Sequence, residues 1–186
     1  MKIAIIGTSG RKGVHMTKDL YEKMYKYLCE LITDIRVKYN LEPQEIKLVS
    51  GGAAWSDHLA VDYYNAEHRV KLTLYVPCKW TGAQYIDNGS YSWKINPGKT
   101  ANYYHTLFSK ALHRDTLSDI QEAVENGCKI IEGNGFHDRN NKIAQCDIMI
   151  AFSWSESDDP NDGGTSYTWN KCGGALEKVH VSLSKL

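Results

Sequence analysis

The sequence predicts an α/β protein: a Rossmann-like, three-layer domain built on a mostly parallel sheet. Short apolar, β-branched segments alternate with segments of helical periodicity along the 186 residues. This alternation is typical of a parallel sheet covered by helices on both faces. The first strand segment is apolar at nearly every position, as in strands buried on both sides. Three predicted strands run into glycine-containing loops. We therefore expect one domain over 1–186, with its ligand at the carboxyl edge of the sheet.

The positions of the elements follow from hydrophobic periodicity and from Gly and Pro. Strands are expected at 2–6, 46–49, 72–76, 129–131 and 147–152, with an edge strand at 179–183. Helices are expected at about 17–38, 55–67, 101–125 with a break near 114–115, 140–145 and 166–179. In the first helix, apolar side chains recur every three or four residues from Leu20 to Ile35, as on an amphipathic helix. Ser56 is the expected N-cap of the second.

An irregular, aromatic-rich insertion is predicted at about 78–100, where neither period holds. It contains Trp80, Tyr85, Tyr91 and Trp93 among several Gly and Pro residues. Structureless stretches of this length are uncommon in compact domains and are often functional. Two interpretations remain open at this point. The aromatic rings pack the loop onto the sheet, or one of them stacks on a base.

Composition excludes several classes of protein. The 22 basic and 22 acidic side chains give no net charge, which disfavours duplex nucleic acid as the main ligand. No apolar stretch approaches the ~18 residues that cross a bilayer, so we expect no membrane contact. The cysteines are widely spaced without a C-x-x-C motif, which indicates free thiols and a cytoplasmic location. The scattered histidines indicate no metal, and the sequence predicts no cofactor.

The loop after the first strand is a candidate ligand-binding loop. It reads Gly-Thr-Ser-Gly-Arg-Lys-Gly over 7–13, and we expect Gly7, Thr8, Ser9 and Arg11 to contact the ligand. Small residues allow a close approach of the backbone, and hydroxyls and cations suit a phosphate. Because Ser9 replaces the second glycine, this is not the dinucleotide fingerprint. A plain turn between strand and helix is the alternative.

Two further glycine loops are predicted at the same edge. The candidate residues are Ser50, Gly51, Gly52 and Asp57 in the second loop and Gly163, Gly164, Thr165 and Ser166 in the third. Each loop precedes a predicted helix, whose N-terminus favours an anion. Asp57 has two equal interpretations: it accepts a hydrogen bond from a ribose hydroxyl, or it stabilises the first helical turn. Together the three loops predict a ligand with at least one phosphate.

These motifs resemble a known group of proteins. The resembling residues are Ser50-Gly51-Gly52-Ala53 with Asp57 and Ala60, then Arg139-Asn140, Asp147, Ala151-Phe152, Gly163-Gly164-Thr165 and Thr168. The second loop resembles the S-G-G-A-x-x-x-D-x-x-A segment of the SLOG superfamily, which includes Lonely Guy phosphoribohydrolases, the DNA-processing protein A family and YspA-like proteins. The remaining residues resemble the YspA-like signature. The similarity extends over nearly the whole chain and is weakest at 78–127.

The resemblance implies a Rossmann-like domain whose glycine loops hold a nucleotide or nucleotide-derived ligand, often in a homodimer. Lonely Guy enzymes cleave nucleoside 5′-monophosphates with an arginine and a glutamate. Arg139 matches that arginine. The next residue, Asn140, belongs to the part of the sequence that resembles the YspA-like signature, and we expect it to contact the ligand. Asn170 stands where the glutamate is expected. Asn170 supplies no charge and no base, so either Asp57 or Glu132 replaces the glutamate, or the protein binds without cleaving.

Three functions follow as expectations. The first is binding of a nucleotide or nucleotide-derived small molecule. The second is N-glycosidic hydrolysis of nucleoside 5′-monophosphates to free base, with Arg139 and Asp57 as the catalytic candidates. The third, single-stranded DNA binding, is disfavoured by the neutral charge. For Arg139 the alternative role is a surface ion pair with Asp138 or Asp147.

Overall fold

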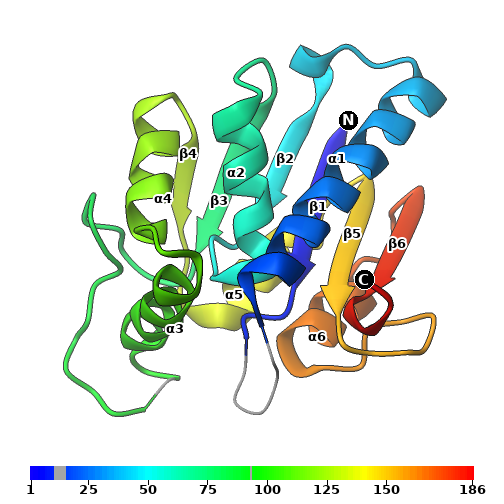
Figure 1. The fold of residues 1–186 in the computed structure, drawn as a ribbon. Coiled ribbons are helices and arrows are strands. Elements are labelled where there is room, and N and C mark those ends of the chain that lie inside the picture. Colours follow the sequence, from blue (N-terminus) through cyan, green and yellow to red (C-terminus); the bar gives the residue numbers. More distant parts are fainter. Residues whose placement is uncertain (11–15, 93) are drawn as a thin grey trace.

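A six-stranded parallel sheet forms the centre of the protein (Figure 1). The computed structural model describes residues 1–10, 16–92 and 94–186. The strands are β1 (Lys2–Gly7), β2 (Lys47–Ser50), β3 (Lys71–Val76), β4 (Lys129–Glu132), β5 (Ile148–Ser153) and β6 (Glu177–Ser182). They lie in the order β4-β3-β2-β1-β5-β6, and every pairing is parallel. The predicted Rossmann-like α/β fold is confirmed.

Helices cover both faces of this sheet. They are α1 (Lys18–Tyr39), α2 (Leu59–Ala66), α3 (Pro97–Leu112), α4 (Thr116–Glu125), α5 (Gly135–Ile143) and α6 (Gly163–Lys171), with 3₁₀ turns η1 (Pro43–Glu45), η2 (Trp55–His58) and η3 (Leu183–Lys185). Helices α1, α2 and α4 lie in front of the sheet in Figure 1. Successive residues of β1 point to opposite faces: Ile3 and Ile5 join the core under α1, whereas Ala4 and Ile6 join the core under α5 and α6. The result is three layers.

Several predicted boundaries are wrong by part of a helix. Helix α5 begins at Gly135 rather than at 140, so Arg139 lies inside the helix. Helix α6 begins at Gly163 and ends at Lys171, because the chain must leave it to form β6. Helix α3 begins at Pro97, with Asn96 as its N-cap, because proline suits the first turn. The irregular segment therefore ends at Asn96.

Ser56 is not a helix N-cap, contrary to the prediction. The segment Trp55–His58 forms a 3₁₀ turn before α2, and Ala54 occupies its N-cap position. Ser56 is fully buried, and its Oγ lies 3.5 Å from the carbonyl oxygen of Phe152 in β5. The predicted break near 114–115 is confirmed, since α3 ends at Leu112 and α4 begins at Thr116.

The strand order reverses beside β1. The chain builds β1, β2, β3 and β4 toward one edge and then crosses over to place β5 on the other side of β1. In such sheets a crevice opens at the carboxyl ends of the two strands that flank the reversal. Here these are β1 and β5, and the N–H of Thr8 donates to the carbonyl of Phe152 across them at 2.9 Å. The strand order therefore favours a ligand site at the carboxyl ends of β1 and β5.

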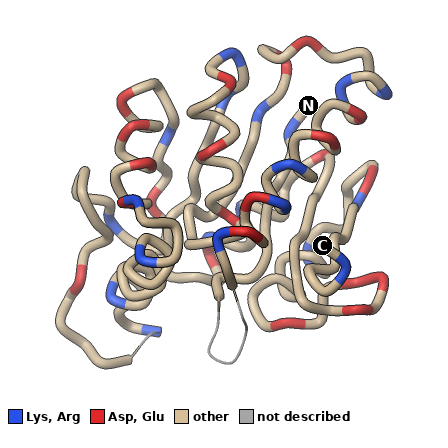
Figure 2. The backbone as a smooth tube through the Cα atoms, in the orientation of Figure 1, with Lys and Arg blue, Asp and Glu red and all other residues tan. Residues whose placement is uncertain are grey.

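Charges are mixed along the described chain. Basic and acidic side chains alternate along α1, for example (Figure 2). No helix among the residues that the structure describes combines the length and the apolar character needed to cross a bilayer.

Candidate functional site

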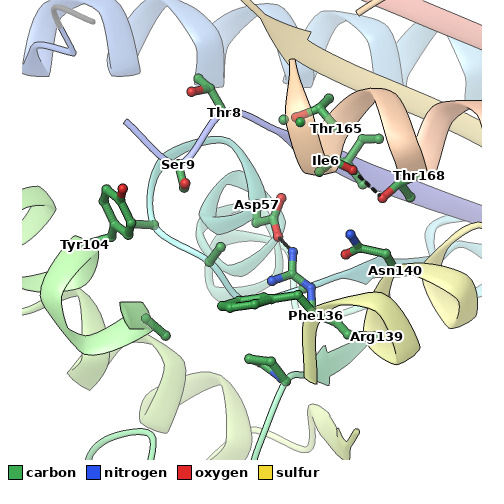
Figure 3. Close-up of a pocket in the computed structure, with 18 of the residues that line it drawn as sticks. Ile6, Thr8, Ser9, Asp57, Tyr104, Phe136, Arg139, Asn140, Thr165 and Thr168 are labelled. Carbon is green, nitrogen blue, oxygen red and sulfur yellow. Dashed lines mark hydrogen bonds and ion pairs between the residues drawn. The ribbon is translucent and has the colours of Figure 1, made fainter. Parts of the chain in front are cut away.

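A cavity of about 690 Å³ opens at the carboxyl edge of the sheet (Figure 3). Its walls come from the loops after β1, β2 and β3, from α3 and α5, and from the N-terminus of α6. The volume is in the range of small-molecule sites, and the position is the one that the strand order predicts. Elements far apart in sequence therefore meet around one ligand-sized space.

Most of the candidate residues from the sequence line this cavity. They are Gly7, Thr8, Ser9, Gly51, Gly52, Asp57, Arg139, Asn140, Gly163, Gly164 and Thr165. Ser50 and Ser166 lie outside the lining. The Oγ of Ser50 donates to the carbonyl of Ile5 at 2.8 Å, and the Oγ of Ser166 accepts from the side-chain amide of Asn170 at 3.3 Å. Arg11, with Lys12 and Gly13, lies outside the described residues.

Arg139 and Asp57 form an ion pair inside the cavity. The Nη2 of Arg139 lies 2.7 Å from the Oδ2 of Asp57, and the two side chains are 11% and 2% exposed. Arg139 projects from α5 and Asp57 from the turn after β2 (Figure 3). The alternative of a surface pair is wrong, because Asp138 binds Lys142 and the carboxylate of Asp147 accepts from the N–H of Lys2. Arg139 therefore belongs to the cavity wall.

The Asp57 carboxyl has an unusual electrostatic environment. Burial raises its pKa, while the charge of Arg139 and the backbone amides of Ala53, Gly7 and Gly51 oppose that rise. Both interpretations from the sequence keep a structural basis, since Asp57 lies in the first turn of η2 and also lines the cavity. A carboxyl whose pKa is raised in a cleft is a candidate proton donor or acceptor.

Two polar atoms of the lining have no hydrogen-bond partner among the residues that the structure describes. They are the Nε of Arg139 and the Oδ1 of Asp162, both buried from solvent. Asp162 holds the N-cap position of α6, but its side chain makes no capping hydrogen bond. Leaving a buried donor or acceptor unpaired costs about 1–3 kcal/mol. A ligand reaches these two atoms only if the side chains rotate toward the cavity; an acceptor for Arg139 and a donor for Asp162 would then recover that cost.

Aromatic side chains form further parts of the wall. They are Tyr85, Tyr104, Phe136, His137 and Tyr167. The guanidinium carbon of Arg139 lies 5.7 Å from the Phe136 ring centre. The rings of His137 and Tyr167 meet edge to face at 4.9 Å, which ties α5 to α6. Of these residues the sequence indicated only Tyr85. Phe136 and His137 lie within one turn of Arg139, and that proximity was the available signal.

The aromatic insertion divides between packing and exposure. Trp80 and Tyr85 are buried and meet edge to face at 5.1 Å, so the packing interpretation is confirmed for these two. Tyr91 is 95% exposed, and Trp93 lies outside the described residues. Trp80 and Tyr91 do not line the cavity, and Tyr85 lines it but is buried. None of these three rings is therefore free to stack on a base.

Of the two carboxyls proposed to replace the missing glutamate, Asp57 lines the cavity and Glu132 does not. Asn170 is exposed and outside the lining, and Glu132 accepts from the N–H of Trp80 at 3.1 Å, also outside it. Among the described residues, the lining carboxyls are those of Asp57 and Asp162. In the part of the chain that the structure describes, the ionisable groups of the lining that suit charge chemistry are therefore these two carboxyls, Arg139 and His137.

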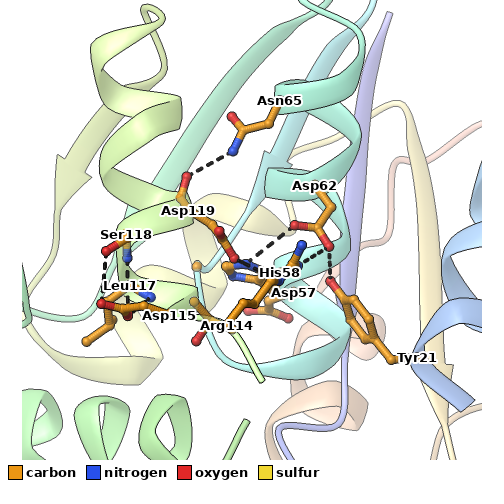
Figure 4. Close-up of polar contacts among 12 residues, drawn as sticks. Tyr21, Asp57, His58, Asp62, Asn65, Arg114, Asp115, Leu117, Ser118 and Asp119 are labelled. Atoms are coloured by element: carbon orange, nitrogen blue, oxygen red, sulfur yellow. Dashed lines mark hydrogen bonds and ion pairs between the residues drawn. The ribbon is translucent and has the colours of Figure 1, made fainter. Parts of the chain in front are cut away.

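A second polar cluster lies between α1, α2 and α4 (Figure 4), and its residues His58, Asp62 and Asp119 do not line the cavity. His58, Asp62 and Asp119 offer three metal-ligand atoms within 4.8 Å of one another. Arg114 contacts both carboxylates, and Tyr21 donates to Asp62 at 2.8 Å. The chain itself therefore supplies the positive charge at this position. The cluster fastens three helices to one another.

Fold and cavity together define a Rossmann-like α/β protein with a ligand-sized pocket at its sheet edge. The chain is similar to uncharacterized protein R261 of Acanthamoeba polyphaga mimivirus, with 33% identity over 188 residues that cover 99% of this chain and 97% of the viral protein. The chain belongs to the family of that protein. No family model and no solved structure matches it.

Proposed function

We propose that this protein binds a nucleotide or a nucleotide-derived small molecule in the cavity. One observation carries the proposal: the guanidinium of Arg139 is held in the cavity wall by Asp57, and its Nε has no hydrogen-bond partner among the described residues. A phosphate oxygen suits that position because guanidinium groups bind phosphate through two parallel hydrogen bonds. The Nη2 already binds Asp57, so the pair keeps the arginine oriented before the ligand arrives.

The N-terminus of α6 supports an anion at the same site. Gly163, Gly164 and Thr165 line the cavity and form the first turn of the helix. The first N–H groups of a helix have no partner within it, and its dipole favours negative charge there. The two glycines leave space for a close approach of the ligand.

The remaining walls suit the other parts of a nucleotide. Tyr104, Phe136 and Tyr167 offer aromatic surface for a base, where stacking contributes about 1–3 kcal/mol per base. The unpaired Oδ1 of Asp162 would accept a hydrogen bond from a sugar hydroxyl. The resemblance to SLOG proteins leads to the same class of ligand. The five free thiols suit a reducing compartment such as the cytosol.

Comparison of each nucleoside with its monophosphate tests the proposal. At ~100 times its dissociation constant a ligand adds about 2.7 kcal/mol to stability, so thermal shifts should favour the monophosphates. Arg139→Lys keeps the charge but loses the planar fork, and affinity should fall at least ~tenfold, about 1.4 kcal/mol. Arg69→Lys is the control, because Arg69 pairs with Glu67 on the surface. Equal shifts for nucleosides and nucleotides would refute the proposal.

Hydrolysis of nucleoside 5′-monophosphates is the second candidate function, and the buried carboxyl of Asp57 favours it. Cleavage of an N-glycosidic bond develops positive charge on the sugar, which a carboxylate stabilises. Chromatography after incubation with nucleoside monophosphates would detect free base. Release of base by the wild type and its loss in Asp57→Asn would establish the enzyme; binding without release would leave a binding protein.

A further inference from the structure

The carbonyl of Gly52, in the second glycine loop, is held by two buried side chains, one of which, Tyr85, also lines the cavity. The hydroxyl of Tyr85 donates to the Gly52 oxygen at 2.6 Å, and the Nε2 of His105 lies 3.0 Å from the same oxygen. Both side chains are almost fully buried. A carbonyl oxygen has two lone pairs, so both are occupied.

The tautomer of His105 follows from its partners. Burial, and then the nearby His58, lower the pKa of His105 to about 3, so the ring is neutral at neutral pH. The Gly52 oxygen only accepts, so Nε2 must carry the proton. The Nδ1 then accepts from the hydroxyl of Thr116, 2.9 Å away at the start of α4. This chain of contacts fixes the ring against the loop.

The backbone of Tyr85 is held by two hydrogen bonds to the side chain of Asn102. The side-chain oxygen of Asn102 accepts from the N–H of Tyr85 at 3.0 Å, and its amide donates to the Tyr85 carbonyl at 2.8 Å. Asn102 belongs to α3, whereas Tyr85 belongs to the irregular segment. The insertion and α3 thus form a single clamp on Gly52.

The clamp orients a whole peptide group. In a trans peptide the C=O and the following N–H point in opposite directions. Holding the Gly52 carbonyl toward Tyr85 and His105 therefore turns the N–H of Ala53 the other way. That amide is among the groups that favour the charged form of Asp57. Gly52 itself has φ +61°, and a Cβ there would lie 2.8 Å from the Tyr85 hydroxyl, so only glycine fits.

We propose that Tyr85 and His105 are positioning residues, which hold the Gly52–Ala53 peptide so that its N–H faces the Asp57 carboxyl in the cavity. This assigns a role to the irregular segment: through Tyr85 it fixes the orientation of the Gly52–Ala53 peptide and so the electrostatic environment of Asp57. The proposal stands without any ligand. Its consequence for ligand affinity rests on the proposed function.

The test measures the titration of Asp57 by carbon NMR of its carboxyl group in the ligand-free, full-length chain. Among the described residues, Arg139 on α5 and the Tyr85 hydroxyl are ionisable groups that act on this carboxyl. Burial keeps Tyr85 neutral by raising its pKa, so Tyr85→Phe removes a hydrogen bond and no charge. We expect the pKa of Asp57 to rise by roughly half a unit or more in Tyr85→Phe, because the Ala53 amide is less well aligned.

Tyr64→Phe is the matched control. Its hydroxyl also donates to a backbone carbonyl, that of Asn126, and its side chain is also buried, but it lies outside the cavity lining. The pKa of Asp57 should not change in Tyr64→Phe. His105→Gln places an amide donor near the position of Nε2, so it should retain the wild-type titration, whereas His105→Leu should shift it. This second pair decides the question if Tyr85→Phe does not fold.

Two outcomes would overturn the proposal: an unchanged Asp57 titration in Tyr85→Phe, or an equal change in Tyr64→Phe. Nucleotide affinity provides a separate measurement and should fall several-fold in Tyr85→Phe and in His105→Leu, but not in Tyr64→Phe. If no variant and no wild-type protein binds a nucleotide, but the Asp57 titration still shifts, the proposed function fails and the positioning role stands.

Discussion

The guanidinium group of Arg139 lies flat against the backbone of Gly51, 88 positions earlier in the chain. A Cβ on Gly51 would lie 2.1 Å from Nη2 and 2.2 Å from both Cζ and Nε of Arg139. Contacts this short do not occur, so the glycine is required for the arginine to reach Asp57. The glycine loop therefore serves the protein's own cation before it serves any ligand.

Gly51→Ala should displace Arg139 from the cavity wall. We expect a loss of stability of about 1–3 kcal/mol from overpacking and a nucleotide affinity reduced at least ~tenfold, about 1.4 kcal/mol. Denaturant unfolding and calorimetry measure the two effects. Gly173→Ala is the control, because a Cβ at Gly173 meets no atom within 4 Å. Wild-type affinity in Gly51→Ala would show that the arginine position is irrelevant to binding.

Arg139 and Asp57 should be strongly coupled in stability. Arg139→Met leaves Asp57 buried without its partner, and breaking a buried pair costs about 3–5 kcal/mol. The loss is limited because Asp57 can take up a proton. Adding Asp57→Asn should recover much of it, and urea unfolding of the four proteins gives the coupling energy. Lys38→Met, which breaks the exposed pair with Glu177, should change stability little. Additive losses would contradict a buried pair.

Acid should destabilise the protein through His105. The pKa of this ring is lowered from 6.5 to about 3, so below pH 6.5 the unfolded chain binds a proton that the folded chain refuses. Stability therefore falls as pH decreases from about 6.5 toward 3, by up to ~1.4 kcal/mol per pH unit from this group. His105→Gln should flatten the profile measured by urea unfolding between pH 7 and 4. His68→Gln, at an exposed position, should retain the wild-type slope.

Asp162 should select ligands with a hydroxyl donor. Its buried Oδ1 has no partner among the described residues, and leaving such an acceptor unpaired costs about 1–3 kcal/mol. We expect ribonucleotides to bind more tightly than their 2′- or 3′-deoxy analogues. This difference in affinity should be smaller in Asp162→Asn than in the wild type. Asp158→Asn, exposed in the same loop, is the control. If both analogues bind the wild type as tightly as the ribonucleotide, Asp162 does not read the sugar.

We predict a homodimer that uses the outer side of the irregular segment and α3. Ile95, Tyr103 and Leu107 are 66%, 59% and 39% exposed there, and exposed apolar patches of this kind are common at interfaces. Light scattering at micromolar concentration should give twice the 21.0 kDa of the chain. Tyr103→Lys should dissociate the dimer, whereas Val37→Lys on α1 should not. A single-chain mass for the wild type would contradict this prediction.

The alternation of strand and helix patterns predicted the fold class, and most of the residues predicted for the site line the cavity. Apolar strands such as Lys2–Gly7 are specified locally, because a strand buried on both faces needs an unbroken apolar run. Gly7, Gly51 and Gly163 could be assigned to one edge because parallel strands all end there. The predicted starts of α5 and α6 were wrong by several residues. Gly135 and Gly163 begin these helices, whereas a glycine more often follows the end of a helix.

The side chains that meet in the cavity could not be read from the sequence, because their contacts form only when the helices pack on the sheet. The sequence offered two carboxyls, those of Asp57 and Glu132, as substitutes for the missing glutamate. The partner of Asp57, Arg139, lies 82 residues away on α5. Phe136, Asp162 and Tyr167 enter the cavity because α5 and α6 pack side by side, which no local pattern records. Tyr85 and His105 contact the carbonyl oxygen of Gly52 from elements that follow it by 33 and 53 residues in the sequence. Contacts of this kind depend on how helices dock on the sheet, and side chains distant in the sequence carry no mutual signal before the chain folds.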